Sequence, residues 1–87
     1  MFRMVVQDAF MGTAPNRTLV VFYGPCENLF PMPKYLRDSS GRVISVMPPF
    51  HLSRDGFASF ATYDLPDAES IIGLELFAVP REEWPEQ

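Results

Sequence analysis

The stretch Leu19-Val20-Val21-Phe22-Tyr23 decides the fold class of this 87-residue chain. All of its residues are aliphatic, β-branched or aromatic, and such side chains favour a pleated strand. No polar residue alternates with them, so we expect a strand that is buried on both faces and lies centrally in its sheet. The predicted strand begins at Arg17 and ends before Gly24-Pro25.

Further short strands are predicted on both sides of this one. Residues 2–7 alternate between one face with Phe2, Met4 and Val6 and a second face that carries Arg3 and Gln7. Residues 11–16 are expected to be a loop, and residues 25–41 a long irregular segment. Apolar runs bounded by turn-forming residues predict the remaining strands at 34–37, 42–47, 57–63 and 71–79.

Turn-forming residues separate these runs. Asp38-Ser39-Ser40-Gly41 is typical of a short hairpin loop. Pro48-Pro49 is expected to stop the strand before it, since proline lacks the N–H that a sheet ladder uses. Residues 65–70 are predicted as a loop in which Pro66 can open one helical turn.

Five to six short strands with turn signals about every 8–12 residues are typical of a small antiparallel β-sandwich or barrel. We therefore predict a single all-β domain over residues 1–87, in which residues 80–87 form a polar C-terminal tail. Nine prolines agree with short strands rather than helices. The expected core consists of Met4, Val6, Leu19, Val21, Val43, Val46, Phe60, Ile72, Leu74 and Leu76.

The charge of the chain excludes some classes of partner. The net charge is −4 and the pI about 4.7, with seven basic residues against eleven acidic ones. Proteins that bind nucleic acid directly usually carry a basic surface, so we expect no such partner. No apolar run approaches the roughly 20 residues of a membrane span, and Arg3 and Asp8 interrupt the N-terminus too early for a signal peptide. We expect a soluble protein made in the cytoplasm.

No catalytic or metal-binding constellation is evident, so we expect neither enzyme activity nor a cofactor. His51 is the only imidazole, and the closeness of Ser53 and Asp55 in the sequence does not by itself make a triad, which needs a base oriented towards its nucleophile. Cys26 is the only cysteine, which rules out an intramolecular disulfide. Its expected role is that of a small buried hydrophobic residue.

Three carboxylates, Asp64, Asp67 and Glu69, lie close together in one predicted loop. The ordinary interpretation is a solvated turn. A calcium site is the alternative, because loop carboxylates suit that hard cation, although the ligand spacing of an EF-hand is absent.

Two features are candidate protein-binding surfaces. Residues 29–35 are irregular but rich in apolar side chains, and an exposed apolar loop often marks an interaction site. The tail carries a tryptophan, a residue type enriched at interaction hot spots. The alternative for both is that the side chains fold back and cover the sheet. The candidate residues are Phe30, Met32, Tyr35 and Trp84.

Residues 19–61 combine an aromatic-ended strand with a series of turn steps built on proline, aspartate and glycine. The relevant residues are Val21-Phe22-Tyr23, Pro31 to Tyr35, Arg37-Asp38-Ser39-Ser40-Gly41, Pro48-Pro49, Leu52 and Arg54-Asp55-Gly56-Phe57-Ala58-Ser59-Phe60. This half of the chain resembles the short β-modules of phage tail fibres, spikes and head fibres. Asp55 and Gly56 are adjacent here, whereas the modules separate these two residues, and the strand around Gly73 has no counterpart. The resemblance implies a virion component whose interface lies on β faces and loops, without a cofactor.

We therefore predict a non-enzymatic structural or accessory protein of a phage particle, which acts through contacts with a capsid or tail protein. It would be located in the virion after synthesis in the host cytoplasm. The alternative is a small acidic inhibitor of the anti-defence type, which binds and blocks a host protein complex. Both hypotheses make the partner a protein, and they leave homo-oligomerisation open. They differ in salt dependence, because screening weakens an electrostatic interface far more than an apolar one.

Overall fold

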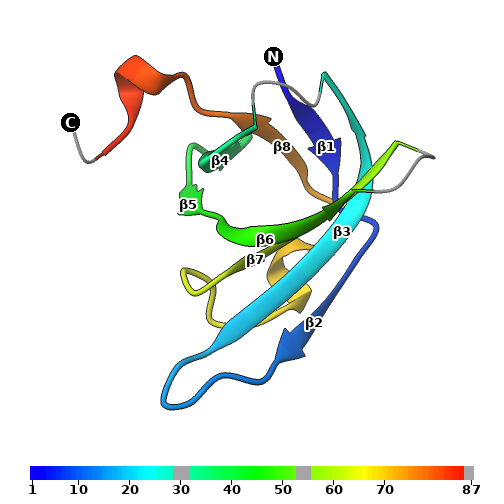
Figure 1. Cartoon of the computed structure of the whole chain (residues 1–87), viewed down its shortest axis with the longest axis vertical. Helices are drawn as coiled ribbons and strands as arrows, with labels where there is room; N and C mark the ends of the chain where they lie inside the picture. The colour runs from blue at the N-terminus through cyan, green and yellow to red at the C-terminus, as the bar shows by residue number, and fades with distance from the viewer. Residues whose placement is uncertain (29–31, 53–55, 86–87) are drawn as a thin grey trace.

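The strands of the protein form one curled antiparallel sheet (Figure 1), which confirms the predicted all-β class. The computed structural model describes residues 1–28, 32–52 and 56–85, with side chains throughout except for residues 48–52. The strands are β1 (Arg3–Val5), β2 (Asp8–Gly12), β3 (Leu19–Glu27), β4 (Tyr35–Asp38), β5 (Val43–Ser45), β6 (Met47–Leu52), β7 (Phe57–Thr62) and β8 (Glu75–Ala78). Two short 3-10 helices, η1 (Glu69–Ile71) and η2 (Arg81–Glu83), flank β8.

The sheet curls because the chain itself connects its two ends. The hydrogen-bonded order is β5-β4-β8-β1-β3-β7-β6, and β2 also pairs with β3. β5 and β6 stand at opposite ends of this order, yet Val46 alone separates them in the sequence. The result is barrel-like. Since β1 and β2 likewise follow one another along β3, the eight strands correspond to six longer stretches of chain, in agreement with the five to six predicted.

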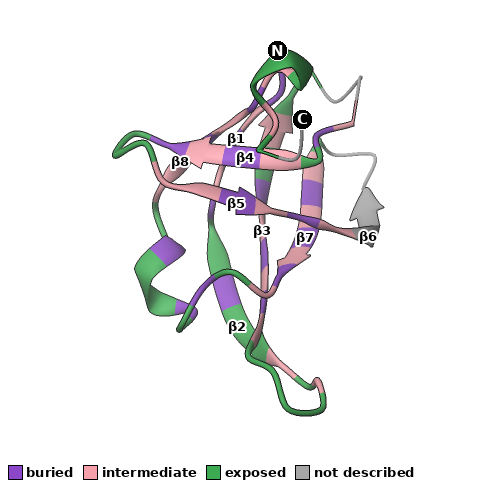
Figure 2. Ribbon diagram, turned by 90° about the vertical axis from the view of Figure 1, so that its left-hand side faces the viewer, coloured by how far each residue is buried: buried purple, intermediate pink, exposed green. Residues whose placement is uncertain are grey.

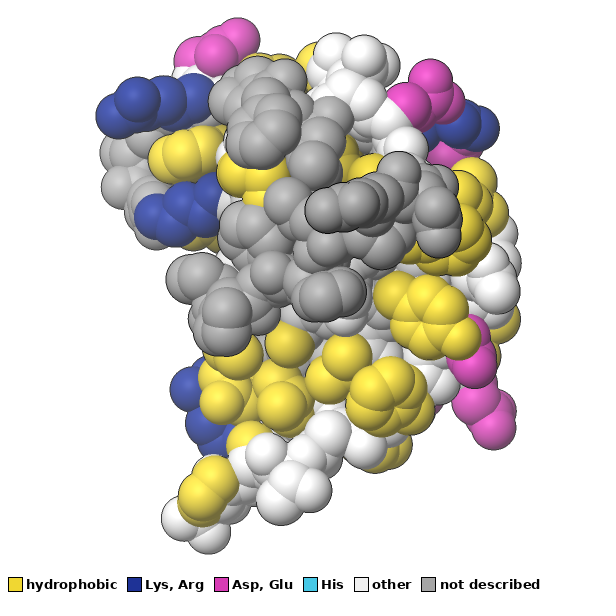
Figure 3. All heavy atoms as spheres, turned by 45° about the vertical axis from the view of Figure 1, so that its right-hand side comes forward, with side chains coloured by type: hydrophobic (Ala, Val, Ile, Leu, Met, Phe, Trp, Pro, Cys, Tyr) yellow, Lys and Arg dark blue, Asp and Glu magenta, His cyan; other side chains and the backbone are white. Residues whose placement is uncertain are grey.

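β3 is central, as predicted, because it pairs with β1 and β2 on one side and with β7 on the other. The predicted burial of both faces was wrong. Val20 and Phe22 are fully buried, whereas Leu19 and Val21 are only partly covered (Figure 2). β3 also continues through Gly24-Pro25 to Glu27 instead of ending before them. Hydrophobic side chains consequently reach the surface and gather in the lower half of the view in Figure 3.

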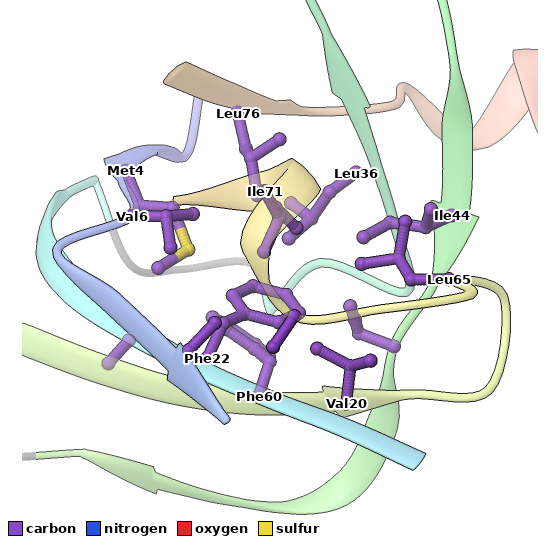
Figure 4. Close-up of a cluster of buried hydrophobic side chains, with 14 of the residues drawn as sticks. Met4, Val6, Val20, Phe22, Leu36, Ile44, Phe60, Leu65, Ile71 and Leu76 are labelled. Carbon is purple, nitrogen blue, oxygen red and sulfur yellow. The ribbon is translucent and has the colours of Figure 1, made fainter. Parts of the chain in front are cut away.

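The core fills the inside of the curled sheet (Figure 4). The prediction was correct for Met4, Val6, Val46, Phe60 and Leu76, all of which are buried. At four other positions the predicted core residue is the sequence neighbour of the buried one. A shift of one position along a strand exchanges its two faces, so a small error of this kind selects the exposed side chain. The buried residues are Val20, Phe22, Ile44 and Ile71 in place of the expected Leu19, Val21, Val43 and Ile72, while Leu74 packs partly buried against the core.

Several predicted element boundaries were also wrong. The predicted loop at 11–16 starts too early, because residues 8–12 form β2. The predicted strand at 71–79 starts at Glu75, and Ile71 belongs to η1. Pro48-Pro49 lies within β6, which pairs with β7 alone and has an irregular register between Met47 and His51. Proline is tolerated at such an edge because no second neighbour needs its missing N–H.

The predicted hairpin at Asp38–Gly41 is confirmed, and the Asp38 carboxylate organises it. Asp38 Oδ1 accepts hydrogen bonds from the backbone N–H of Ser40 at 2.9 Å, the backbone N–H of Arg42 at 3.1 Å and the Ser40 hydroxyl at 2.6 Å. Asp38 Oδ2 accepts Arg42 Nε at 3.1 Å. Burial works to raise the pKa of Asp38, but the hydrogen bonds from Ser40 and Arg42 outweigh it and hold the pKa below the ordinary range.

We expect Asp38→Asn to lower the free energy of unfolding by about 1–3 kcal/mol at neutral pH, because an amide replaces the charged acceptor. A carboxyl whose pKa is lowered on folding stabilises the protein above its unfolded pKa of about 3.9 and loses this effect as the pH falls through the folded pKa. The difference between variant and wild type should therefore shrink between about pH 5 and pH 2. Urea unfolding followed by circular dichroism at both ends of that range measures it, and a constant difference would contradict the assignment.

Candidate functional site

A groove of about 440 Å³ lies where the C-terminal residues leave β8. Its lining comes from three distant parts of the chain, namely residues 1–2, residues 32–34, and residues 78–81 with Trp84. Backbone hydrogen bonds join these parts, since Ala78 N–H donates to Phe2 O and Val79 N–H donates to Tyr35 O, each at 3.0 Å. The pairing of β8 with both β1 and β4 therefore builds the groove.

Trp84 is held in place by its own chain and still forms part of the groove wall. Its indole Nε1–H donates to the carbonyl of Val79 at 3.1 Å. Its ring lies against Tyr35, with 5.8 Å between centroids. η2 is tied to β4 by an ion pair between Arg37 and Glu83 at 3.0 Å. Residues 80–85 of the predicted polar tail thus have a defined position, with Trp84 half-buried.

Two basic side chains stand over the tryptophan. Lys34 Nζ lies 5.2 Å and the Arg81 guanidinium carbon 5.7 Å from the Trp84 ring centroid. Lys34 Nζ also lies 5.9 Å from the Tyr35 ring. Cations at such distances are attracted by the faces of aromatic rings. An apolar groove in an acidic protein therefore carries basic groups beside its aromatic wall.

The groove has a largely apolar lining that suits binding. Among the described residues that line it there is no carboxylate side chain, histidine or cysteine. Its volume falls in the range of roughly 300–1,000 Å³ that is typical of ligand pockets. Phe2, Met32 and Pro33 supply apolar lining.

The structure brings together three of the four predicted binding residues. Met32 and Trp84 line the same groove, and Tyr35 contacts Trp84 directly. Phe30 lies outside the described residues. The sequence analysis missed Phe2 and Arg81, because the proximity of the two chain ends depends on β8 lying between β1 and β4. The only local indication of a site at the C-terminus was the closeness of Pro80, Trp84 and Pro85 in the sequence.

The other sequence candidates do not form a second site in the part of the chain that the structure describes. Asp64 Oδ2 accepts the N–H of Ser45 at 2.7 Å and its hydroxyl at 2.8 Å, while Asp67 Oδ1 accepts Ser70 N–H at 2.8 Å. No group of three or more metal-ligating side chains occurs among the described residues. Hydrogen bonds to Ser45 in β5 and to Ser70 therefore account for the positions of Asp64 and Asp67.

Cys26 and His51 lie on strands of the same sheet. Cys26 is only partly buried in β3, where burial raises the pKa of its thiol, so that the thiol is not activated as a nucleophile. His51 lies in β6 opposite Ser59, and its side chain is outside the described set.

Comparisons with known proteins leave the functional argument to this geometry. No protein-family model matches the chain, and neither a curated protein nor a solved structure gives a significant match. Within the described residues, no helix has the length and apolar character that are needed to cross a membrane.

Proposed function

We propose that the chain is a non-enzymatic protein that acts through protein–protein contacts and holds its partner in the groove beside Trp84. One observation carries this proposal. Met32 and Trp84, which are 52 positions apart in the sequence, line one apolar groove of about 440 Å³. A half-buried tryptophan beside a groove is typical of the anchor residues at interaction hot spots.

The proposed setting is a phage particle, in which the chain is a structural or accessory component bound to a capsid or tail protein. The resemblance of residues 19–61 to the short β-modules of phage fibres and spikes supports this setting. That resemblance implies contacts through β faces and loops. Residues 32–34, which lie in that stretch, contribute to the groove.

A small acidic inhibitor of a host complex is the alternative, but it has less support. Charge mimicry needs carboxylates that are free to meet a basic partner surface. Several carboxylates here are already engaged by arginine, in the pairs Arg3–Glu27, Arg3–Glu75, Arg37–Glu83 and Arg42–Asp38. The groove itself carries Lys34 and Arg81 beside Trp84.

Trp84→Ala should weaken partner binding strongly while the sheet remains folded. Loss of a hot-spot tryptophan costs about 2–4 kcal/mol of binding free energy, which corresponds to roughly 30-fold or more in affinity. The test is affinity capture from infected and uninfected source cells with tagged wild type and variants, followed by mass spectrometry. Ile72→Ala is the matched control, because Ile72 is an exposed apolar residue that does not line the groove.

Capsid or tail proteins captured at a fixed ratio by the wild type and by Ile72→Ala, but not by Trp84→Ala, would support the proposal. Capture that Trp84→Ala leaves unchanged would refute the groove as the binding site. A host complex that is captured only at low salt would replace the virion proposal with the inhibitor. Circular dichroism of each variant, and of Trp84→Phe, which keeps a ring against Tyr35, separates lost binding from lost folding.

A further inference from the structure

A row of apolar side chains crosses the outer face of the sheet at right angles to the strands. Phe10 in β2 is opposite Val21 in β3, Val21 is opposite Ala61 in β7, and Ala61 is opposite Met47 in β6. Directly opposed residues of antiparallel strands point to the same face. Phe10 is 53% exposed, and the other three are only partly covered. The row therefore faces away from the core.

Leu19 extends this row along β3. It is opposite Gly12, and a Cβ placed on Gly12 would lie 2.9 Å from Leu19 Cδ2 and 3.3 Å from Val21 Cγ2. The side chains of Leu19 and Val21 thus lean over the glycine on the same side of the sheet. We call Phe10, Leu19, Val21, Met47 and Ala61 the outer apolar face. Figure 3 shows hydrophobic side chains gathered in the lower half of the view, with basic side chains to their left and acidic side chains to their right.

Charged residues flank the outer apolar face at opposite ends. Exposed Asp8 is opposite Tyr23, beyond one end of the row. The exposed guanidinium of Arg17 lies 3.9 Å from the ring centroid of Tyr63, the residue that follows β7 at the other end. The acidic and the basic group therefore lie at diagonally opposite corners, and Val21 is near the middle of the diagonal.

We propose that a second copy of the chain covers the outer apolar face, with the two faces packed against each other around a two-fold axis near Val21. Such an axis, lying in the interface and perpendicular to the diagonal, places Asp8 of each copy opposite Arg17 of the other. An interface of this kind is self-complementary, as closed dimers require. It also covers the second face of β3, whose continuous run of apolar residues otherwise remains partly exposed.

This inference does not depend on the proposed function, because no residue of the outer apolar face lines the groove beside Trp84. Four strands at a spacing of about 4.8 Å form a patch only about 15–20 Å wide, at the lower end of stable interfaces. We therefore expect a weak dimer. Sedimentation equilibrium of the wild type should show a molecular mass that rises with concentration from the monomer towards the dimer.

Substitutions on the outer apolar face should weaken the dimer at least tenfold. Phe10→Lys places a charge at an exposed position of the row, so the fold should persist while self-association is lost. Ile72→Lys is the control, since Ile72 is 42% exposed but lies outside the row. A wild type that stays monomeric at about millimolar concentration, or a Phe10→Lys variant that dimerises as the wild type does, would overturn the proposal.

Charge reversal tests the orientation of the two copies. Asp8→Arg alone and Arg17→Asp alone each create two like-charge pairs across the two-fold axis, and each should weaken the dimer about tenfold. An equimolar mixture of these two variants restores both pairs, so it should form a heterodimer with near wild-type affinity. A mixture that associates no better than the separate variants would overturn the proposed arrangement.

Discussion

A Gly24→Ala variant should lose its cooperative fold, or at least about 4 kcal/mol of stability, which is an exceptional cost for one methyl group. A Cβ at Gly24 would overlap the carbonyl oxygen of Val5 and lie 2.9 Å from the backbone nitrogen of Gln7. Both are backbone atoms, one at the end of β1 and one in the link between β1 and β2, and they cannot move aside as the end of a side chain can. The expected loss of stability is therefore a purely steric effect.

The clash affects the central connection of the sheet. Gln7 N–H donates a hydrogen bond to Tyr23 O at 2.8 Å. Val6 N–H donates to Leu74 O at 2.9 Å, and Val6 O accepts from Gly73 N–H at 2.8 Å, which ties Val6 to the residues before β8. Moving Val5 and Gln7 away from Gly24 therefore disturbs β3 and the approach to β8 together. A domain of this size has only about 5–10 kcal/mol of stability to lose.

Gly12→Ala is the matched control for this prediction. A Cβ at Gly12 meets Leu19 Cδ2 at 2.9 Å, which is the end of a flexible side chain on the outer face. We expect Gly12→Ala to cost less than about 1 kcal/mol. Urea unfolding followed by far-ultraviolet circular dichroism compares the two variants. Equal stabilities would contradict the close approach of Gly24 to the β1–β2 connection.

Phe60→Ala should lower the free energy of unfolding by about 3–5 kcal/mol, because it removes a large side chain from the centre of the core. Phe60 is 1% exposed. Its ring packs edge to face on Phe2 at 5.6 Å between centroids and lies 5.9 Å from Phe22. The three rings join the N-terminus of β1, β3 and β7 into one cluster, so the cavity would open between three strands.

Phe10→Ala is the control that shows whether the loss of stability comes from the burial of Phe60 or from the removal of any phenylalanine. Phe10 is an aromatic residue in the same sheet, but it is 53% exposed, and its loss should cost less than about 1 kcal/mol. The midpoint of urea unfolding reports both variants. If Phe60→Ala shifted the midpoint no more than Phe10→Ala does, Phe60 would not occupy the centre of the core.

The composition of the candidate site was predictable, but its assembly was not. Met32, Tyr35 and Trp84 were identified because apolar and aromatic residues in irregular segments are either caps or contact sites. In the structure Trp84 is both, since it donates to Val79 O and also lines the groove. Phe2 and Arg81 could not be added from local patterns, because the pairing of β8 with β1 and β4 brings them there.

Local chemistry was sufficient for the all-β class and the Asp38–Gly41 hairpin. Strand propensity and turn geometry act over a few neighbouring residues, and the sequence contains them directly. The inward face of β3 needed the folded sheet. In the run from Leu19 to Tyr23 both alternating sets of side chains are apolar, so a period of two cannot distinguish them. The register against β1, β2 and β7 turns Val20 and Phe22 inward and leaves Leu19 and Val21 on the outer face.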